Sequence, residues 1–133
     1  MNRPFPFTGR IRSFHHAFRG IALMLRSQHN AWIHAALSLV AVTAGILLRL
    51  SAAEWCWIVL AMAAVWAAEA LNTAFEFLAD ATTKEFHPIV GQAKDVAAGA
   101  VLITAISAAL VGAFVFGPRL LTLLDESARG VSA

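Results

Sequence analysis

Residues 69–80, with the sequence EALNTAFEFLAD, decide the fold, because they place polar side chains inside an apolar run that extends from residue 55 to residue 79. These polar side chains recur every three or four residues and therefore share one side of a helix. They are Glu69, Asn72, Glu76 and Asp80. An ionised carboxylate inside membrane hydrocarbon costs about 2.5–3.5 kcal/mol. Carboxylates repeated there predict a membrane helix whose polar side has a function.

Two more apolar runs, at residues 31–48 and 96–118, are long enough to cross a membrane, since about 20 helical residues span the hydrocarbon. Only helices and closed barrels satisfy their backbone hydrogen bonds in lipid, and these runs are too long for barrel strands. The sequence therefore predicts an all-α integral membrane fold, with residues 1–133 as a single domain. Its expected segments are transmembrane helices at 31–49, 55–79 and 94–117, a loop at 80–93, and a short, partly frayed tail at 118–133.

The composition agrees with a membrane protein and excludes other classes. Hydrophobic residues make up 59% of the 133-residue chain and charged residues 14%, whereas soluble domains average about 45–50% and 25%. A domain this small has too little interior to bury such a surplus. These numbers exclude a soluble globular enzyme and a disordered regulator. The single Cys56 excludes a disulfide-stabilised scaffold, and we expect no nucleic-acid partner.

Residues 10–27 are predicted to form a helix that lies on the membrane surface, in the plane of the lipid headgroups. The apolar side chains of this segment, among them Phe14 and Phe18, gather on one side, and its Arg and His side chains gather on another. Such a helix turns its apolar side toward lipid and its bases toward anionic headgroups. The alternative is a helix packed only on protein, and both arrangements can hold together.

The distribution of Lys and Arg predicts the orientation in the membrane. Five Arg precede the first span: Arg3, Arg10, Arg12, Arg19 and Arg26. The 49–54 connection has one base, the 80–95 connection has Lys84 and Lys94, and the C-terminal tail has two bases. Because basic segments are retained inside, we expect a multi-pass protein of the inner (cytoplasmic) membrane. Its N-terminus and the 80–95 loop would face the cytoplasm, and the 49–54 turn and the tail would face outward.

The polar side of the second span has a structural and a functional explanation. The structural explanation is a salt bridge that fixes helix packing. However, Lys84 and Lys94 belong to the 80–95 connection and do not lie deep enough in the membrane to neutralise Glu69. Carboxylates stacked along a membrane helix suit either a divalent cation or the passage of protons. The functional explanation is therefore favoured.

The polar residues after the second span favour phosphoryl transfer. They are Glu85, His87, Lys94 and Asp95. A general base, a metal-binding acid and a cation are what phosphoryl transfer from a nucleotide requires. The sequence has no Gly-rich phosphate-binding motif, so a nucleotide would be held in another way. Asn30 and His34 share one side where the first span begins, which is more typical of a helix–helix hydrogen bond than of a ligand.

The stretch EALNTAFEFLAD (69–80) followed by EFHPIVGQAKDVAAGAVL (85–102) resembles the small prokaryotic diacylglycerol kinase family, which includes the undecaprenol kinases. The combination of E-x-x-N-x-x-x-E-x-x-x-D, E-[FY]-H and A-K-D is specific, and the resemblance covers roughly residues 10–117. It implies a homotrimeric membrane kinase that transfers the γ-phosphate of ATP to a lipid hydroxyl with Mg²⁺. AKDVAAGAVL and the FGP at 116–118 resemble the undecaprenol kinase branch more than the diacylglycerol kinase branch.

The resemblance also implies roles for individual residues. Glu69 matches the general base, and Asn72 the polar catalytic residue beside it. Contacts with the lipid substrate are implied for Glu69, Asn72 and Gly99. Glu76 matches a metal ligand beside the phosphates. The positions that match nucleotide contacts are His16, Glu76, Glu85, His87, Lys94 and Asp95.

One position departs from the family pattern. Relatives carry a second metal-binding Glu two residues before the Asn of a segment resembling E-x-N-x-x-I-H, and this chain has Gln28 there. Gln28 offers a carbonyl oxygen without a charge, whereas Mg²⁺ prefers carboxylates together with phosphate and water. Two other functions stay open. One is a lipid-binding pseudokinase with poor turnover, and the other is a proton- or ion-coupled membrane subunit that uses Glu69 and Glu76 as a relay.

Overall fold

Four helices make up the protein as described by a computed structural model, which covers residues 7–82, 85 and 87–131. They are α1 (Phe7–Ser27), α2 (His29–Leu47), α3 (Ala52–Thr82) and α4 (Pro88–Val131). No strand occurs within these ranges, so the predicted all-α fold is confirmed. The last three helices are each long and apolar enough to cross a membrane, as predicted. Lys84, which contributes to the predicted orientation, lies outside the described residues.

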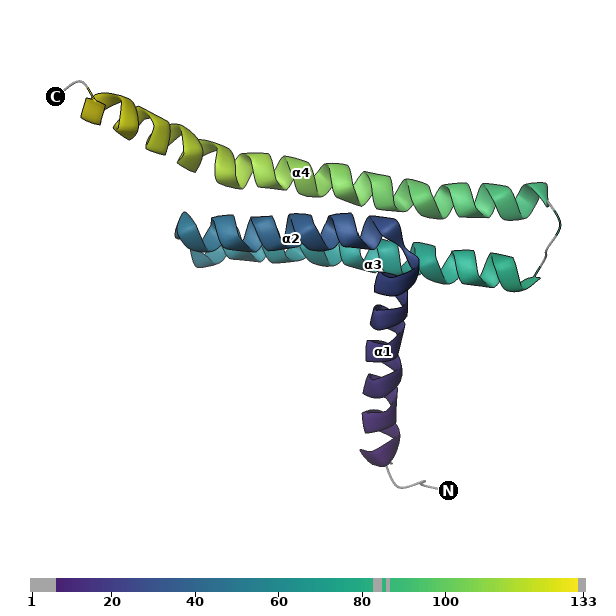
Figure 1. Ribbon diagram of the computed structural model, residues 1–133. Coiled ribbons are helices and arrows are strands. Elements are labelled where there is room, and N and C mark those ends of the chain that lie inside the picture. The colour runs from purple at the N-terminus through teal and green to yellow at the C-terminus, as the bar shows by residue number, and fades with distance from the viewer. Residues whose placement is uncertain (1–6, 83–84, 86, 132–133) are drawn as a thin grey trace.

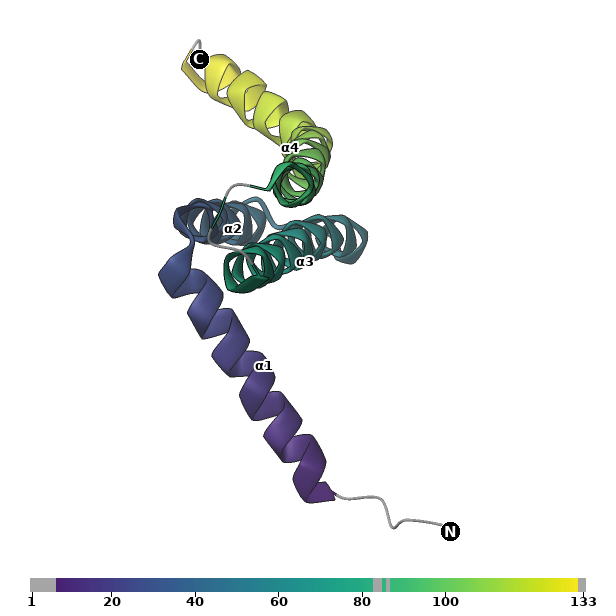
Figure 2. The ribbon, with the colours of Figure 1, turned by 90° about the vertical axis from the view of Figure 1, so that its right-hand side faces the viewer.

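Helix α1 runs in a different direction from the other three helices. α2, α3 and α4 lie lengthwise beside one another, and α1 projects to the side from the start of α2 (Figure 1; Figure 2). The break falls at Gln28, whose backbone is extended, with φ −112° and ψ 119°. One extended residue between two helices redirects the chain without a longer loop. It also places the Gln28 side chain at the corner where α1 and α2 meet.

The chain reverses direction between α2 and α3 through a tight turn. Arg49 has a φ of 52°, the left-handed conformation that ends many helices. The Leu50 N–H donates to the Gly45 carbonyl at 3.0 Å, and the Arg49 N–H donates to the Ile46 carbonyl at 3.2 Å. These two bonds define a Schellman motif, which satisfies carbonyls that the helix itself leaves free.

Close packing of α2 on α3 depends on Gly45 near this turn. A Cβ atom at position 45 would lie 2.7 Å from Cη2 of Trp55, so the indole ring occupies the space of a side chain. Small residues allow this close approach between membrane helices. Farther along the pair, the Trp66 indole N–H donates to the Ser38 hydroxyl at 3.1 Å. The two contacts hold α2 against α3 over much of its length.

Helix α4 is longer than predicted at both ends. The expected loop at 80–93 is shorter, because α3 continues to Thr82 and α4 begins at Pro88. Proline suits the first position of a helix, because an N–H at this position would have no hydrogen-bond partner within the helix. The tail expected to be partly frayed is instead helical to Val131, with Pro118 inside the helix. Pro118 removes a single hydrogen bond, and α4 bends toward its C-terminal end without stopping (Figure 1).

Arg119 joins α4 to the turn between α2 and α3. Its guanidinium donates to both carboxylate oxygens of Glu54, at 3.0 and 2.6 Å, and to the Leu48 carbonyl at 2.7 Å. Glu54 also accepts bonds from the N–H and the hydroxyl of Ser51, at 2.7 and 2.6 Å. A bidentate Arg–carboxylate pair is stronger and more specific than a single contact. This cluster links three helices at the end of the bundle opposite Gln28.

Much of the apolar side of α1 is not covered by protein in the described part of the chain. Ile11 is 71% exposed and Phe18 is 69% exposed. A helix that lies in the headgroup region needs apolar side chains exposed in this way, so that lipid can cover them. The position of α1 on the membrane surface stays a prediction.

We expect Arg119→Ala to lower the Tm of the detergent-solubilised protein by several degrees, because it removes the three hydrogen bonds to Glu54 and Leu48. Thermal unfolding followed by Trp fluorescence measures this change. Arg119→Lys should recover only part of the loss, since an ammonium group cannot form the bidentate pair.

Arg129→Ala is the matched control. Arg129 pairs with Asp125 one turn away on the same exposed helix, and such pairs contribute little to stability. Equal Tm losses for Arg119→Ala and Arg129→Ala would show that the Arg119 cluster does not hold the helices together.

Candidate functional site

Gln28, Asn72 and Glu76 form a hydrogen-bonded cluster between the α1–α2 corner and α3. Gln28 Nε2 donates to Glu76 Oε2 at 2.6 Å, and Asn72 Nδ2 donates to Glu76 Oε1 at 3.2 Å. Each carboxylate oxygen of Glu76 therefore accepts a bond from an amide group. The structure thus brings together the two predicted metal-site residues, Gln28 and Glu76, which are 48 positions apart in the sequence.

Glu69 lies seven positions before Glu76 on α3, toward the middle of the bundle, and the residue is 0% exposed. Neither of its carboxylate oxygens has a hydrogen-bond partner among the described residues, and neither does Asn72 Oδ1. The nearby Thr73 hydroxyl donates to the Glu69 backbone carbonyl, at 2.9 Å. Burying a carboxylate without a donor is costly. Three such oxygens in adjacent turns therefore indicate a binding site.

Helix α2 contributes His34 and Asn30 to the same region. His34 Nε2 lies 3.9 Å from Glu69 Oε2, which is too long for a hydrogen bond. Together with Asn30 and Asn72, these side chains line a cavity of about 240 Å³, called the polar cavity below. Its other walls are apolar: Ile33, Ala98, Val101, Leu102 and Ala105.

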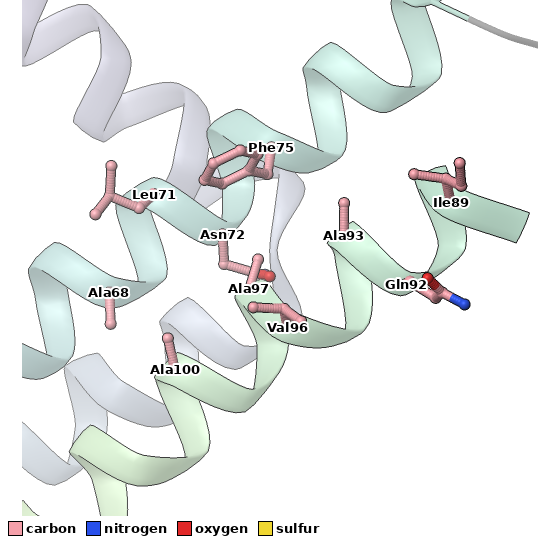
Figure 3. Close-up of a pocket in the computed structure, with 10 residues that line it drawn as sticks. All are labelled: Ala68, Leu71, Asn72, Phe75, Ile89, Gln92, Ala93, Val96, Ala97 and Ala100. Carbon is pink, nitrogen blue, oxygen red and sulfur yellow. The ribbon is translucent and has the colours of Figure 1, made fainter.

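A larger cavity of about 640 Å³ lies between α3 and α4 and is called the apolar cavity below (Figure 3). Asn72, Leu71 and Phe75 border it from α3, and small residues such as Ala93 and Ala97 border it from α4. Asn72 lines both cavities. A polar cavity that adjoins an apolar one suits an amphipathic ligand.

The other predicted site residues line neither of these two cavities. Lys94 pairs with Asp80 at 3.2 Å, at the end of α3 that is far from Glu69 along the helix. Four predicted nucleotide contacts have exposed side chains: His16, Glu85, His87 and Asp95. Gly99 lies between Ala98, which borders the polar cavity, and Ala100, which borders the apolar cavity.

The oxygens around Glu76 suit a cation that arrives with phosphate groups. The described residues include no group of three or more His, Cys, Asp or Glu that could hold a metal ion. Glu76 offers a carboxylate, and Gln28 offers an amide oxygen once its amide group is turned over. Mg²⁺ is usually bound by one or two carboxylates together with substrate phosphates and water. The donor set therefore fits Mg²⁺ bound to a phosphorylated ligand.

His34 and Asn30 were not among the site residues predicted from the sequence. Their separation by four positions places them on one side of α2, but spacing alone does not show what that side faces. The structure turns it toward Glu69 and the polar cavity. The acidic residue that needs such neighbours is on another helix, so no local pattern could reveal the pairing.

Comparison with known proteins adds independent information. A family model described as prokaryotic diacylglycerol kinase matches residues 15–116. This range contains the hydrogen-bonded cluster of Gln28, Asn72 and Glu76. The chain is 39% identical to an undecaprenol kinase of Bacillus subtilis over 109 residues, which cover 82% of this chain and 89% of the relative. It is 38% identical to a diacylglycerol kinase of a Synechocystis species over 113 residues, which cover 84% of this chain and 65% of that relative.

We expect Gln28→Glu to lower the Tm in the absence of divalent cations, because a second carboxylate beside Glu76 replaces a 2.6 Å hydrogen bond with charge repulsion. Added Mg²⁺ should then raise the Tm of the variant more than that of the unmodified protein. The concentration of Mg²⁺ that gives half of this rise should fall roughly tenfold, which corresponds to about 1.4 kcal/mol.

Gln92→Glu is the control for the added charge, because Gln92 is exposed on α4 and belongs to the apolar cavity instead. Superimposed Mg²⁺ titrations for Gln28→Glu and Gln92→Glu would show that residue 28 does not lie beside a cation site.

Proposed function

We propose that this chain, which belongs to the prokaryotic diacylglycerol kinase family and is a lipid kinase, transfers the γ-phosphate of ATP to the hydroxyl group of a membrane lipid. The observation that carries this proposal is Glu69, a buried carboxylate whose two oxygens lack donors and which lines a cavity between membrane helices. A lipid hydroxyl can reach this depth from within the bilayer. The ion-relay alternative has no comparable support from the relatives.

Glu69 acts as the general base in this mechanism. The lipid hydroxyl donates to a Glu69 oxygen, and its proton passes to the carboxylate as the new oxygen–phosphorus bond forms. The bond between the γ-phosphorus and the bridging oxygen of ATP breaks in the same step, and ADP leaves with that oxygen. Asn72 lies between this base and the phosphate side of the site, because its amide N–H donates to Glu76 while its Oδ1 has no donor among the described residues. Asn72 therefore fixes the separation between the acceptor hydroxyl and the group that holds the phosphates.

Glu76 and Gln28 form the phosphate side of the site. Mg²⁺ held there would neutralise charge on the transferring phosphate. Lys94, now paired with Asp80, is the point charge that would exchange this partner for a phosphate oxygen. The exposed His16, Glu85, His87 and Asp95 are the proposed nucleotide contacts. Their exposure leaves them accessible to ATP from the aqueous side.

We favour undecaprenol over diacylglycerol as the acceptor lipid. Both present a primary hydroxyl on an apolar body, so the polar cavity alone does not distinguish them. Support comes from the segments AKDVAAGAVL and FGP and from the undecaprenol kinase that this chain matches over 89% of that relative's length. The apolar cavity of about 640 Å³ would accommodate the first part of the lipid chain.

We further propose that the protein is a homotrimer in the inner membrane. Among the described residues of a single chain, only α3 and α4 border the apolar cavity, and a second copy packed there would enclose the lipid. Native mass spectrometry from nanodiscs tests this point, and a monomeric mass for active protein would contradict it. The cytoplasmic N-terminus follows from the five Arg before the first span.

We expect Glu69→Gln to reduce phosphoryl transfer by about 10²- to 10⁴-fold, the usual effect of losing a general base. Mg-ATP should still raise the Tm of the variant, because the phosphate side is intact. The assay offers undecaprenol and diacylglycerol in parallel with γ-³²P-labelled ATP.

Glu126→Gln makes the same chemical change at an exposed position near the end of α4 and should retain full activity. Near-normal activity of Glu69→Gln would contradict the assignment of the base and would make Asp95 the next candidate. Labelling of diacylglycerol alone would contradict the preference for undecaprenol.

We expect the α2–α3 turn to face outward and the α3–α4 connection to face the cytoplasm. In a Cys56→Ala background, Ala53→Cys should react with an impermeant thiol reagent added to intact cells, and Ala81→Cys should not. Both alanines are exposed near opposite ends of α3, so the two variants form a matched pair. The reverse pattern would separate the site from cytoplasmic ATP and contradict the kinase mechanism.

A further inference from the structure

The side chain of His34 lies inside the bundle, 13% exposed, with its Nε2 3.9 Å from Glu69 Oε2. His34 belongs to α2, whereas the two predicted catalytic residues, Glu69 and Asn72, both belong to α3. His34 and Glu69 both line the polar cavity. The imidazole therefore approaches the carboxylate from across the space that a lipid hydroxyl would enter.

Few other ionisable groups surround this pair. From α4, the polar cavity is lined by Ala98, Val101, Leu102 and Ala105, none of which ionises. From α3, Glu76 is an acidic neighbour of Glu69, and both oxygens of Glu76 already accept amide bonds. From α1, the cavity shared with α3 is lined by Ala17, Gly20, Ile21, Leu23 and Met24, none of which ionises. His34 is thus the ionisable side chain of α2 that faces Glu69.

The numbers of donors and acceptors show why Glu69 needs a second partner. Both of its oxygens lack a donor among the described residues, and a lipid hydroxyl has one proton to donate. One carboxylate oxygen would remain buried without a partner during the reaction, which is costly. Hydrogen bonds of catalytic groups are often long without substrate and shorten when it binds. A small rotation of either side chain would bring the His34 N–H into hydrogen-bond range of Oε2.

We propose that His34 is a positioning residue for Glu69: its ring N–H binds Oε2 when the lipid enters, which leaves Oε1 directed at the acceptor hydroxyl. This inference rests on Glu69 being the base of the proposed function. His34 fixes the orientation of the carboxylate. It takes no part in bond making, and the proton of the hydroxyl goes to Glu69.

The test compares His34→Phe with His34→Gln. Phenylalanine keeps a ring of similar size but has no donor, whereas the glutamine amide N–H can reach Oε2. We expect His34→Phe to lower kcat by roughly 10- to 100-fold, the usual effect of losing an orienting partner, with no change in KM for Mg-ATP. His34→Gln should recover most of kcat. A residue with only a packing role would show the opposite preference.

Val40→Ala is the matched control, because Val40 lies six positions farther along α2, is 63% exposed and borders neither of the two cavities. It should leave kcat unchanged. If His34→Phe does not fold, His34→Asn replaces it: its shorter amide cannot reach Oε2, so its kcat should fall below that of His34→Gln.

A kcat for His34→Phe within twofold of the unmodified protein would overturn the inference, as would equal losses for the Gln and Phe variants. Glu69→Gln, assayed beside them, separates the two levels of the argument. An active Glu69→Gln refutes the proposed base and the role of His34 with it. An inactive Glu69→Gln beside unaffected His34 variants refutes only the role of His34.

Discussion

Glu69 carries a carboxylate that is fully buried between apolar helices and accepts no hydrogen bond from the described residues. A buried carboxylate lowers the stability of the folded chain, so the surrounding contacts must offset that cost. Its immediate neighbours do not hydrogen-bond its carboxylate oxygens, so these oxygens can still bind a ligand that enters the polar cavity. His34 lies beyond hydrogen-bond distance, and the Thr73 hydroxyl donates to the backbone. The site is thus arranged around a buried carboxylate without donors among the described residues, and the proposed mechanism uses this carboxylate as its base.

Contacts at the two ends of the bundle hold α2, α3 and α4 around this carboxylate. At one end, Gln28 and Asn72 fix both oxygens of Glu76. At the other end, Arg119 joins Glu54 and the Leu48 carbonyl. Between them, the bond from Trp66 to Ser38 holds α2 against α3. In lipid the hydrophobic effect does not press helices together, so these polar bonds and close packing determine their positions.

The three spans could be predicted from the sequence, because apolar runs of this length have few other stable folds. The shared side of Glu69, Asn72 and Glu76 also followed from their spacing on α3. The continuation of α4 through Pro118 to Val131 did not, because proline usually ends a helix in water but is tolerated in membrane helices. Contacts between residues far apart in the sequence could not be predicted either. For His34 the sequence gives only its spacing from Asn30. No local pattern links Glu54 to Arg119, which are 65 positions apart.

The central claim is that Glu69 meets the acceptor hydroxyl of a lipid within the membrane. The most direct measurement uses a polyprenyl lipid that carries an epoxide in place of that hydroxyl. A base carboxylate attacks an epoxide carbon, the carbon–oxygen bond of the ring opens, and the lipid becomes attached as an ester. Mapping the ester by mass spectrometry after incubation in membranes identifies the carboxylate concerned. The account predicts attachment at Glu69, and attachment at Glu76 or Asp80 with Glu69 unmodified would contradict it.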